Sequence, residues 1–414
     1  MQAIGVLASV AGVAGGYYAW RALDDPTVKA SQARFRAVRI ELRESVGRLA
    51  HIAADLHTDA APALERIGSS ALLADATMRP ASPLPISRIR LVWADSEPPE
   101  DRALTAAARR VLPKRTRWSR YTGYAEALES LMRPALFDNR PAFRLLEADW
   151  RHADGPLLTF GRGRYFDLVD QGEAMTHELA QAAGRTAAAP AWRRMPLHAL
   201  LKSDPLSLSR RVVIPSIGTL TVRRTAAGQG TFFLLYRSPG QSAHGEGTYS
   251  VIPGGIFQPA SLSPVGYLRD LNLWHNIMRE YNEEMLGAAE ATGEGGVEVD
   301  YTRSPYSDFE HALSHGHLRV WCFGMGVEAQ NLVPCLLTIA VFNADVFDTI
   351  FTTIVDSNDE GILVSGPRST AVTGLPLEEG EVRHVLASPQ LAPIAAALLH
   401  LALQHRTLLL GDNN

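Results

Sequence analysis

Apolar residues follow two different spacings along this chain. In residues 23–80 they recur every seven positions from Phe35 to Leu56, as expected for a helix with one apolar stripe. In residues 206–406, runs of β-branched and aromatic residues alternate with glycine-containing turns and end in an amphipathic helix. This order predicts an α/β (α+β) fold, in which helices flank a mixed sheet. A proline-rich stretch at 78–85, MRPASPLP, is the clearest boundary between units.

The heptad segment fits two arrangements. Its apolar positions, interrupted once at Ser45, are sufficient for a short coiled coil that joins two copies of the chain into a homodimer. They fit equally well a single amphipathic helix that lies on the body of the same chain. Residues 86–205 mix helical and strand patterns, and we assign them to an accessory α/β region.

The first residues of the chain differ from the rest. Residues 3–20 carry no charge and end in Tyr17, Tyr18 and Trp20, which favour the lipid–water interface. Basic residues begin at Arg21, so residues 1–22 are predicted to be a single transmembrane anchor with the main body in the cytoplasm. A cleaved signal peptide is less favoured because no basic residue precedes the apolar stretch, and a helix buried against the protein or a partner is the third interpretation.

Composition narrows the range of functions. Apolar residues make up 46% of the chain and charged residues 20%, and the formal net charge is -4. No global basic field therefore points to nucleic acid as a partner. The two cysteines, Cys322 and Cys335, lie in apolar, strand-like sequence, which indicates reduced core thiols rather than a disulfide or a zinc site.

Candidate chemistry is concentrated on one helix, which is predicted to start near residue 271 and contains the sequence REYNEEMLG. Glu280, Glu283 and Glu284 lie on one arc of this helix, where like charges repel. A divalent cation, Mg²⁺ or Mn²⁺, would offset that repulsion because these ions prefer grouped oxygen ligands. The neighbouring arc is an apolar stripe that should face the core and comprises Trp274, Ile277, Met278, Tyr281 and Met285.

The surroundings of this acidic arc leave two interpretations open. Arg279, four residues before Glu283, could hold that carboxylate in place. The same charges also fit a solvated acidic face with one internal ion pair. Gly254 and Gly255, at the end of the preceding strand, favour a binding site, because a glycine pair lets a metal or a phosphate approach the backbone.

These residues resemble the Nudix box. PGGIF followed by REYNEEMLG is similar to that motif's glycine, loop and Arg-Glu-any-any-Glu-Glu helix, with Gly255 as the opening glycine. The resemblance implies that Arg279, Glu280, Glu283 and Glu284 belong to a hydrolase of nucleoside diphosphates linked to another group. It also implies Mg²⁺ or Mn²⁺ held mainly by the glutamates, because the metal neutralises diphosphate charge.

The chain departs from the Nudix box in the loop. Gly255 and Arg279 are about ten residues further apart than in the box, and the slot for the loop glutamate, eight residues before Arg279, is Leu271. The final glycine is displaced by one position, to Gly287. Residues 258–272 are therefore predicted to be an inserted loop that reshapes the surroundings of the substrate. More broadly, residues 91–406 resemble a Nudix-like region of uncharacterised bacterial regulator-like proteins.

Some further residues are candidates for the same site. The resemblance implies one more acidic ligand from a later segment, and Glu310 or Glu328 could supply it. The segment 357–361, SNDEG, is predicted to be a turn whose Asp359 and Glu360 could line the site.

Histidines add two weaker candidates. His315 and His317 would point to one face of a strand, which allows metal binding, although ordinary surface histidines are more frequent. His177 and Glu178 lie on a predicted helix and are interpreted as a solvated or locally hydrogen-bonded face.

Three functions can be distinguished from these patterns. The first is a membrane-anchored, metal-dependent Nudix-type hydrolase of a nucleotide-derived small molecule, with Glu283, Glu284 and Arg279 in catalytic roles. The second is a non-catalytic sensor that binds such a ligand and signals through the anchor or the linker. The intact REYNEE sequence favours the first, and the altered loop favours the second. A scaffold whose acidic helix is merely surface has the least support.

Overall fold

The structure is a computed structural model that describes residues 25–185, 188–240, 247–261, 263–289, 298–352, 361–364 and 374–411. The predicted transmembrane anchor, residues 1–22, lies outside this set, as do Asp359 and Glu360. Among the described residues, no helix combines the length and the apolar character that a membrane crossing requires.

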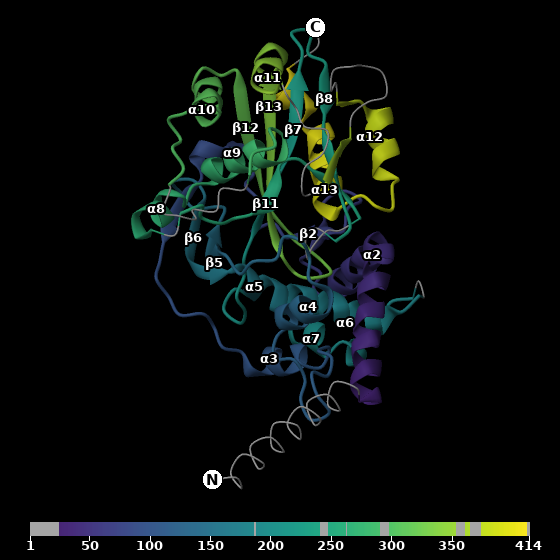
Figure 1. Cartoon of the computed structure of the whole chain (residues 1–414). Helices are drawn as coiled ribbons and strands as arrows, with labels where there is room; N and C mark the ends of the chain where they lie inside the picture. Colours follow the sequence, from purple (N-terminus) through teal and green to yellow (C-terminus); the bar gives the residue numbers. More distant parts are fainter. Residues whose placement is uncertain are drawn as a thin grey trace, which may run out of the picture.

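The predicted α/β class is confirmed as a curled mixed sheet with helices on both faces (Figure 1). The sheet has nine strands in the order β1-β2-β12-β13-β7-β8-β15, with β3 beside β12 and β11 beside β7. The strands are β1 (Glu65–Arg66), β2 (Leu72–Ala74), β3 (Leu84–Pro85), β7 (Ser216–Arg224), β8 (Gly230–Phe232), β11 (Gly254–Ile256), β12 (Leu318–Glu328), β13 (Pro334–Asn343) and β15 (Leu375–Pro376).

Two smaller sheets adjoin the large one. One contains β10 (Tyr249–Val251), β9 (Leu234–Arg237) and β14 (Gly361–Val364), and the other contains β4 (Arg90–Trp93), β6 (Leu157–Arg164) and β5 (Pro141–Asp149). The longer helices are α2 (Pro26–Ala60), α4 (Tyr124–Met132), α6 (Ala174–Ala183), α9 (Leu273–Glu284), α10 (Tyr306–Ser314), α12 (Glu379–Leu386) and α13 (Pro393–Gln404). The shorter helices are α3 (Arg102–Ala108), α5 (Tyr165–Leu168), α7 (Pro196–Leu200), α8 (Pro264–Arg269), α11 (Ala344–Ile350) and α14 (Arg406–Leu410).

Strand β7 organises the large sheet. It pairs in parallel with β13 from Ser216 opposite Cys335 to Arg224 opposite Asn343, and antiparallel with β8 and β11. Because side chains alternate along a strand, β7 presents Gly218 to α13 and Thr221 to α9 on the opposite face. The sheet is therefore covered by α13 on one side and by α9, α10 and α11 on the other.

The heptad segment forms α2, which packs along α6 and α4 of the same chain. Asp25 caps its start by accepting from the backbone N–H of Thr27, and Pro26 follows at the first helical position, where proline is well tolerated. Phe35, Leu42 and Leu49 are buried in this packing. The apolar stripe is thus covered within one chain, as in the second of the two predicted arrangements.

The proline-rich stretch at 78–85 packs into the large sheet. Strand β3 pairs with β12 at Trp321 and Cys322, and Met78 is buried. Strand β2, which precedes this stretch, also pairs with β12. Residues 65–85 therefore contribute strands to the same sheet as β7 and β13.

A buried polar network joins α2, α4, α6 and α7. Arg39 on α2 forms an ion pair with Glu173, and the hydroxyl of Tyr124 bonds to Nδ1 of His177. Glu178 accepts hydrogen bonds from the backbone N–H groups of Leu197 and His198. The prediction of a solvated face for His177 and Glu178 is wrong, since both are buried, whereas the prediction of local hydrogen bonding is confirmed.

Candidate functional site

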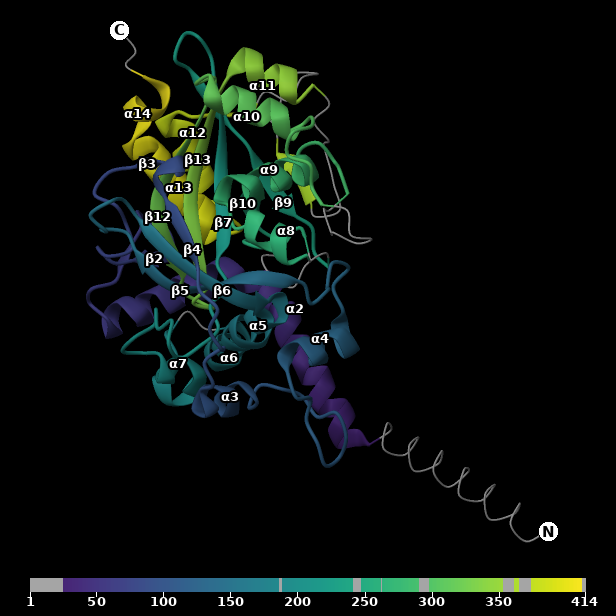
Figure 2. The same ribbon diagram turned by 90° about the vertical axis from the view of Figure 1, so that its left-hand side faces the viewer.

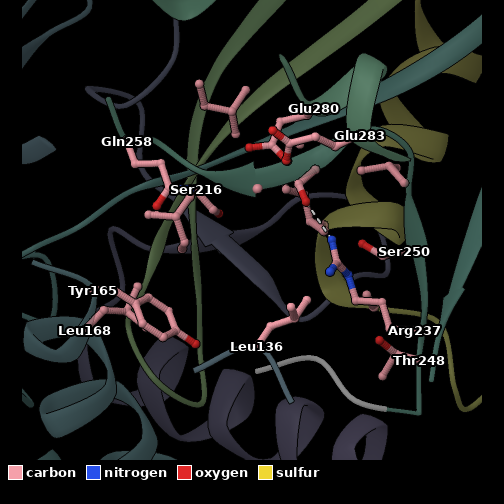
Figure 3. A pocket seen from close by; sticks show the side chains of 18 of the residues that line it. Leu136, Tyr165, Leu168, Ser216, Arg237, Thr248, Ser250, Gln258, Glu280 and Glu283 are labelled. Atoms are coloured by element: carbon pink, nitrogen blue, oxygen red, sulfur yellow. Dashed lines mark hydrogen bonds between the residues drawn. The ribbon is translucent and has the colours of Figure 1, made fainter. Parts of the chain in front are cut away.

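A pocket of about 210 Å³ lies where β7, β11, β9 and the start of α13 meet segment 136–168 (Figure 3). One wall carries Glu280 and Glu283 from α9 together with Gly254 and Gly255 from β11. The wall therefore combines the helix and the diglycine strand that the sequence singles out. These elements meet because β11 pairs with β7 while α9 packs across the same face.

The side chain of Glu280 lies directly against Gly255. A Cβ atom built on Gly255 would come within 2.2 Å of Oε1 and 2.5 Å of Oε2 of Glu280. Real Cβ atoms do not approach other atoms so closely, so any other residue at this position would require the Glu280 carboxylate to shift. Oε1 of Glu280 also accepts a bond of 3.3 Å from the side-chain amide of Asn276.

Glu283 is the more exposed of the two pocket glutamates, and its side chain lies next to that of Glu280 in Figure 3. Both residues line the pocket. Two carboxylates on one wall can share a hard cation such as Mg²⁺, which binds through one or two carboxylates and keeps several waters. The donor chemistry of this wall therefore fits a divalent cation.

Glu284 lies outside the pocket wall and is buried beneath the diglycine strand. Its Oε2 accepts from the N–H of Gly254 at 3.0 Å, and its Oε1 is 3.3 Å from Nη2 of Arg237. The same Nη2 donates to the carbonyl of Gly254 at 2.6 Å. Arg237 therefore engages the carbonyl and the carboxylate that could otherwise bind a metal together.

Arg279 is oriented away from Glu283 and toward the inserted loop. Its guanidinium donates to the carbonyl of Gln258 and to the hydroxyl of Tyr301, and lies 3.7 Å from the buried carboxylate of Asp270. Tyr301 donates to Asp270 at 2.9 Å, and burial raises the pKa of its hydroxyl. Arg279 thus positions the loop, instead of holding Glu283 as the spacing suggested.

The inserted loop folds into α8 and a turn around Asp270. This carboxylate is fully buried and accepts from the backbone N–H groups of Ala260 and Ser261 at 2.9 and 3.0 Å. It is one residue before Leu271, the slot in which the Nudix box places its loop glutamate. A buried acidic partner for Arg279 is therefore present, shifted by one position.

The opposite side of the pocket is largely apolar and aromatic, and it comes from the region assigned as accessory from the sequence. Leu136, Tyr165 and Leu168 line it (Figure 3), and Phe137 is a further lining residue. Asp138 and Arg140 add one charge of each sign from the same segment. Pockets with an apolar wall and a few convergent charged groups are typical small-molecule sites. The geometry suits a ligand with one flat apolar part and one charged part.

Of the two other acidic candidates, Glu328 lines the pocket and Glu310 does not. Glu328, at the end of β12, lines the same pocket and is buried, where its Oε2 accepts from the side-chain amide of Asn331 at 2.8 Å. Glu310 lies on α10 and is not part of the pocket lining. Among the described residues, no three or more His, Cys, Asp and Glu side chains are grouped as a metal site.

The prediction that His315 and His317 lie on a strand is wrong. His315 ends α10 and His317 precedes β12, and both side chains are exposed. Cys322 and Cys335 are buried and unpaired, as predicted, and burial raises the pKa of the Cys322 thiol to about 12.

Arg237, Asp270 and the apolar wall from residues 136–168 were not predicted from the sequence. Arg237 is the last residue of an apolar strand, and nothing in the local sequence predicts its contact with Gly254, which lies 17 residues later in the chain. Asp270 occupies no position of the Nudix box, although an acid just before the helix cap Asn272 is a visible signal in the sequence. Comparison with known proteins finds no family model and no curated protein that matches the chain.

Proposed function

We propose that this protein is a Nudix-type hydrolase that acts on a nucleotide-derived diphosphate in the pocket beside Gly255. The observation that carries the proposal is the contact between Gly255 and the Glu280 carboxylate, with Glu283 beside it on the pocket wall. This arrangement leaves two carboxylates facing a cavity at the place where the sequence resembles the Nudix box.

Glu280 and Glu283 are the residues that would hold Mg²⁺ or Mn²⁺. The metal would neutralise diphosphate charge and polarise the attacked phosphorus or a water. The protein's own groups would bind and orient the ligand. The apolar wall at Tyr165 and Leu168 takes a flat ring, and Arg237 lies at the pocket edge, where a guanidinium can pair with a phosphate oxygen.

A second candidate function is a sensor that binds the same class of ligand without hydrolysing it. The observation in its favour is Arg237, which pairs with Glu284 and donates to the carbonyl of Gly254. The guanidinium of Arg237 neutralises the charge of the Glu284 carboxylate, as a bound metal ion would, without an added ion. Binding would then not require a divalent cation.

One experiment separates the two functions. The full chain is incubated with a panel of nucleoside diphosphate derivatives, with Mg²⁺, with Mn²⁺ or with a chelator, and both product formation and the melting temperature are measured. A hydrolase gives metal-dependent product that falls at least about 100-fold in Glu280→Gln and in Glu283→Gln, because each loses a charged oxygen ligand. Glu310→Gln, on α10 outside the pocket lining, is the matched control and keeps its activity.

The sensor gives a different set of results. A ligand raises the melting temperature in the presence of chelator, no product forms, and Arg237→Gln abolishes the shift. That outcome would contradict the hydrolase proposal. If no compound in the panel is cleaved or bound with any metal, both functions are contradicted for nucleoside diphosphate derivatives.

A further inference from the structure

Residues 109–120, called the basic hairpin below, consist of a turn after α3 and a hairpin closed between Lys114 and Arg120, with an exposed tryptophan at its tip. The sequence RRVLPKRTRWSR contains six lysines and arginines and no acidic residue. Lys114 pairs with Arg120 in an antiparallel bridge, and the backbone N–H of Arg115 donates to the carbonyl of Ser119 at 3.0 Å. The segment between them is therefore a closed turn.

The tip of this basic hairpin is ordered by its own side chains. The Thr116 hydroxyl accepts from the backbone N–H groups of Trp118 and Ser119 at 3.2 and 3.1 Å, and lies 2.7 Å from the Ser119 hydroxyl. These bonds fix the turn in one conformation. The indole of Trp118 is nevertheless 86% exposed, with the guanidinium of Arg117 4.9 Å from its ring centre.

An exposed tryptophan on a fixed turn has an energetic cost in water. Large aromatic side chains are normally buried, since burying their apolar surface is strongly favourable. Below the tip, Val111, Leu112 and Pro113 are buried and anchor the hairpin to the body. The hairpin therefore holds Trp118 outward, where it can only be covered by something outside the described chain.

The basic hairpin lies beside the first turns of α2, where the described part of the chain begins (Figure 2). The backbone N–H of Lys114 donates to the hydroxyl of Ser31 at 3.0 Å, and the side chain of Gln32 donates to the carbonyl of Lys114 at 3.0 Å. Lys29 and Arg34 add two exposed cations to the same end of the molecule. Two acidic residues offset part of this charge, because Arg115 pairs with Glu126 at 2.6 Å and Asp25 lies near Arg117. The cations still outnumber these carboxylates at this end of the molecule.

We propose that the basic hairpin docks on an anionic phospholipid surface, with Trp118 in the interface and the surrounding cations on lipid phosphates. Tryptophan prefers the lipid–water interface because its ring is apolar and its N–H is polar. Clustered lysines and arginines are attracted by the negative surface potential of anionic lipids. No residue of the basic hairpin lines the pocket beside Gly255.

The test uses fluorescence quenching by lipids brominated on their acyl chains. The full chain and Trp118→Phe are reconstituted in phosphatidylcholine vesicles with and without phosphatidylglycerol. In vesicles with phosphatidylglycerol, the native chain should lose more fluorescence than Trp118→Phe, because only the native chain has an indole at the tip. The difference should disappear without phosphatidylglycerol and at about 1 M salt, where charges are screened within about 3 Å.

A double variant separates the role of charge from folding. Lys114→Gln with Arg117→Gln should reduce the Trp118-dependent quenching by about tenfold, whereas Arg303→Gln with Arg383→Gln should leave it unchanged. The control arginines are exposed and lie on α12 and just before α10, at the other end of the molecule from α3 (Figure 1). Equal quenching of the native chain and Trp118→Phe with phosphatidylglycerol present would overturn the proposal.

Single-stranded nucleic acid is the competing partner, since it also binds through cations and an aromatic platform. A single-stranded oligonucleotide is therefore titrated into the full chain and into the double variant. Binding that the double variant loses, together with lipid quenching that does not depend on Trp118, would assign the basic hairpin to nucleic acid and overturn the membrane assignment.

Discussion

Gly255 leaves space for the Glu280 carboxylate on the pocket wall. In Gly255→Ala, the new Cβ would overlap that carboxylate, so the Glu280 side chain must shift from its position. We expect nucleotide or metal binding to weaken at least about tenfold, because a misplaced ligand group loses the oriented contact. Isothermal titration checks this, with Gly380→Ala on α12 as the control, since a Cβ there meets no atom within 4 Å. Unchanged affinity in Gly255→Ala would show that binding does not depend on this position of the Glu280 carboxylate.

The buried charge pair of the inserted loop should contribute strongly to stability. Asp270→Asn removes the charge opposite Arg279, which is itself buried. Breaking a buried pair leaves an uncompensated charge, and we expect a loss of about 3 kcal/mol in the free energy of unfolding, measured by urea denaturation. Glu379→Gln, in the exposed pair with Arg383, should cost less than about 1 kcal/mol. A similar small cost for Asp270→Asn would contradict the assigned role of Arg279.

His57 should make stability depend on pH. The imidazole is fully buried, neither ring nitrogen has a hydrogen-bond partner in the described part of the chain, and desolvation lowers its pKa to about 3. Between about pH 6.5 and pH 3 the unfolded chain binds a proton at this residue that the folded chain does not, so stability falls as the pH falls. The slope attributable to His57 is about 1.4 kcal/mol per pH unit.

His57→Phe removes this titration without removing a hydrogen bond. Urea denaturation between pH 4 and pH 6 should then show a shallower fall in stability, by about that slope. The exposed His384, changed to Phe, serves as the control. An unchanged slope in His57→Phe would mean that the folded protein binds a proton at this site as readily as the unfolded chain.

At the scale of elements, the segment before residue 86 should be indispensable. A chain that starts at Ile86 lacks α2 and the strands β1, β2 and β3, and would expose the edge of β12 and the apolar residues beneath α2. We expect it to aggregate or to show no cooperative unfolding, because exposed strand edges and apolar surface promote association. Circular dichroism with thermal melting tests this, with a chain that starts at Asp25 as the control. A cooperative transition in the shorter chain would show that residues 86–411 fold alone.

Elements with strong local periodicity were predictable from the sequence. The apolar stripe of α9 is buried as predicted. Strands β7, β12 and β13 lie within residues 206–406, where strand-like runs were expected, and α13 is an amphipathic helix near the end of that region. The pairing of β2 and β3 with β12 was not predictable, because β2 has three residues and β3 has two, too few for a local pattern. Strand partners are set by packing between distant segments, which local spacing does not record.

At the site too, local sequence spacing predicted only the residues that lie close together along the chain. Glu280 and Glu283 were recognised because their spacing on one helix is a local property. The pairing of Arg237 with Glu284 joins residues that are 47 positions apart, and the apolar wall comes from a region that the sequence assigned to a separate unit. Residues that act together across such separations carry no shared local pattern.

At the scale of the whole molecule, the pocket is assembled from segments spread along most of the chain. Its walls include Leu136, Ser216, Glu283, Glu328 and Ile394. Contacts between distant residues form late in folding, since closing long loops is entropically unfavourable. During synthesis, the pocket cannot be completed until residue 394 has been added and α13 has packed on β7. Ligand binding therefore reports that translation has passed this point, and a shorter nascent chain cannot be stabilised by the ligand.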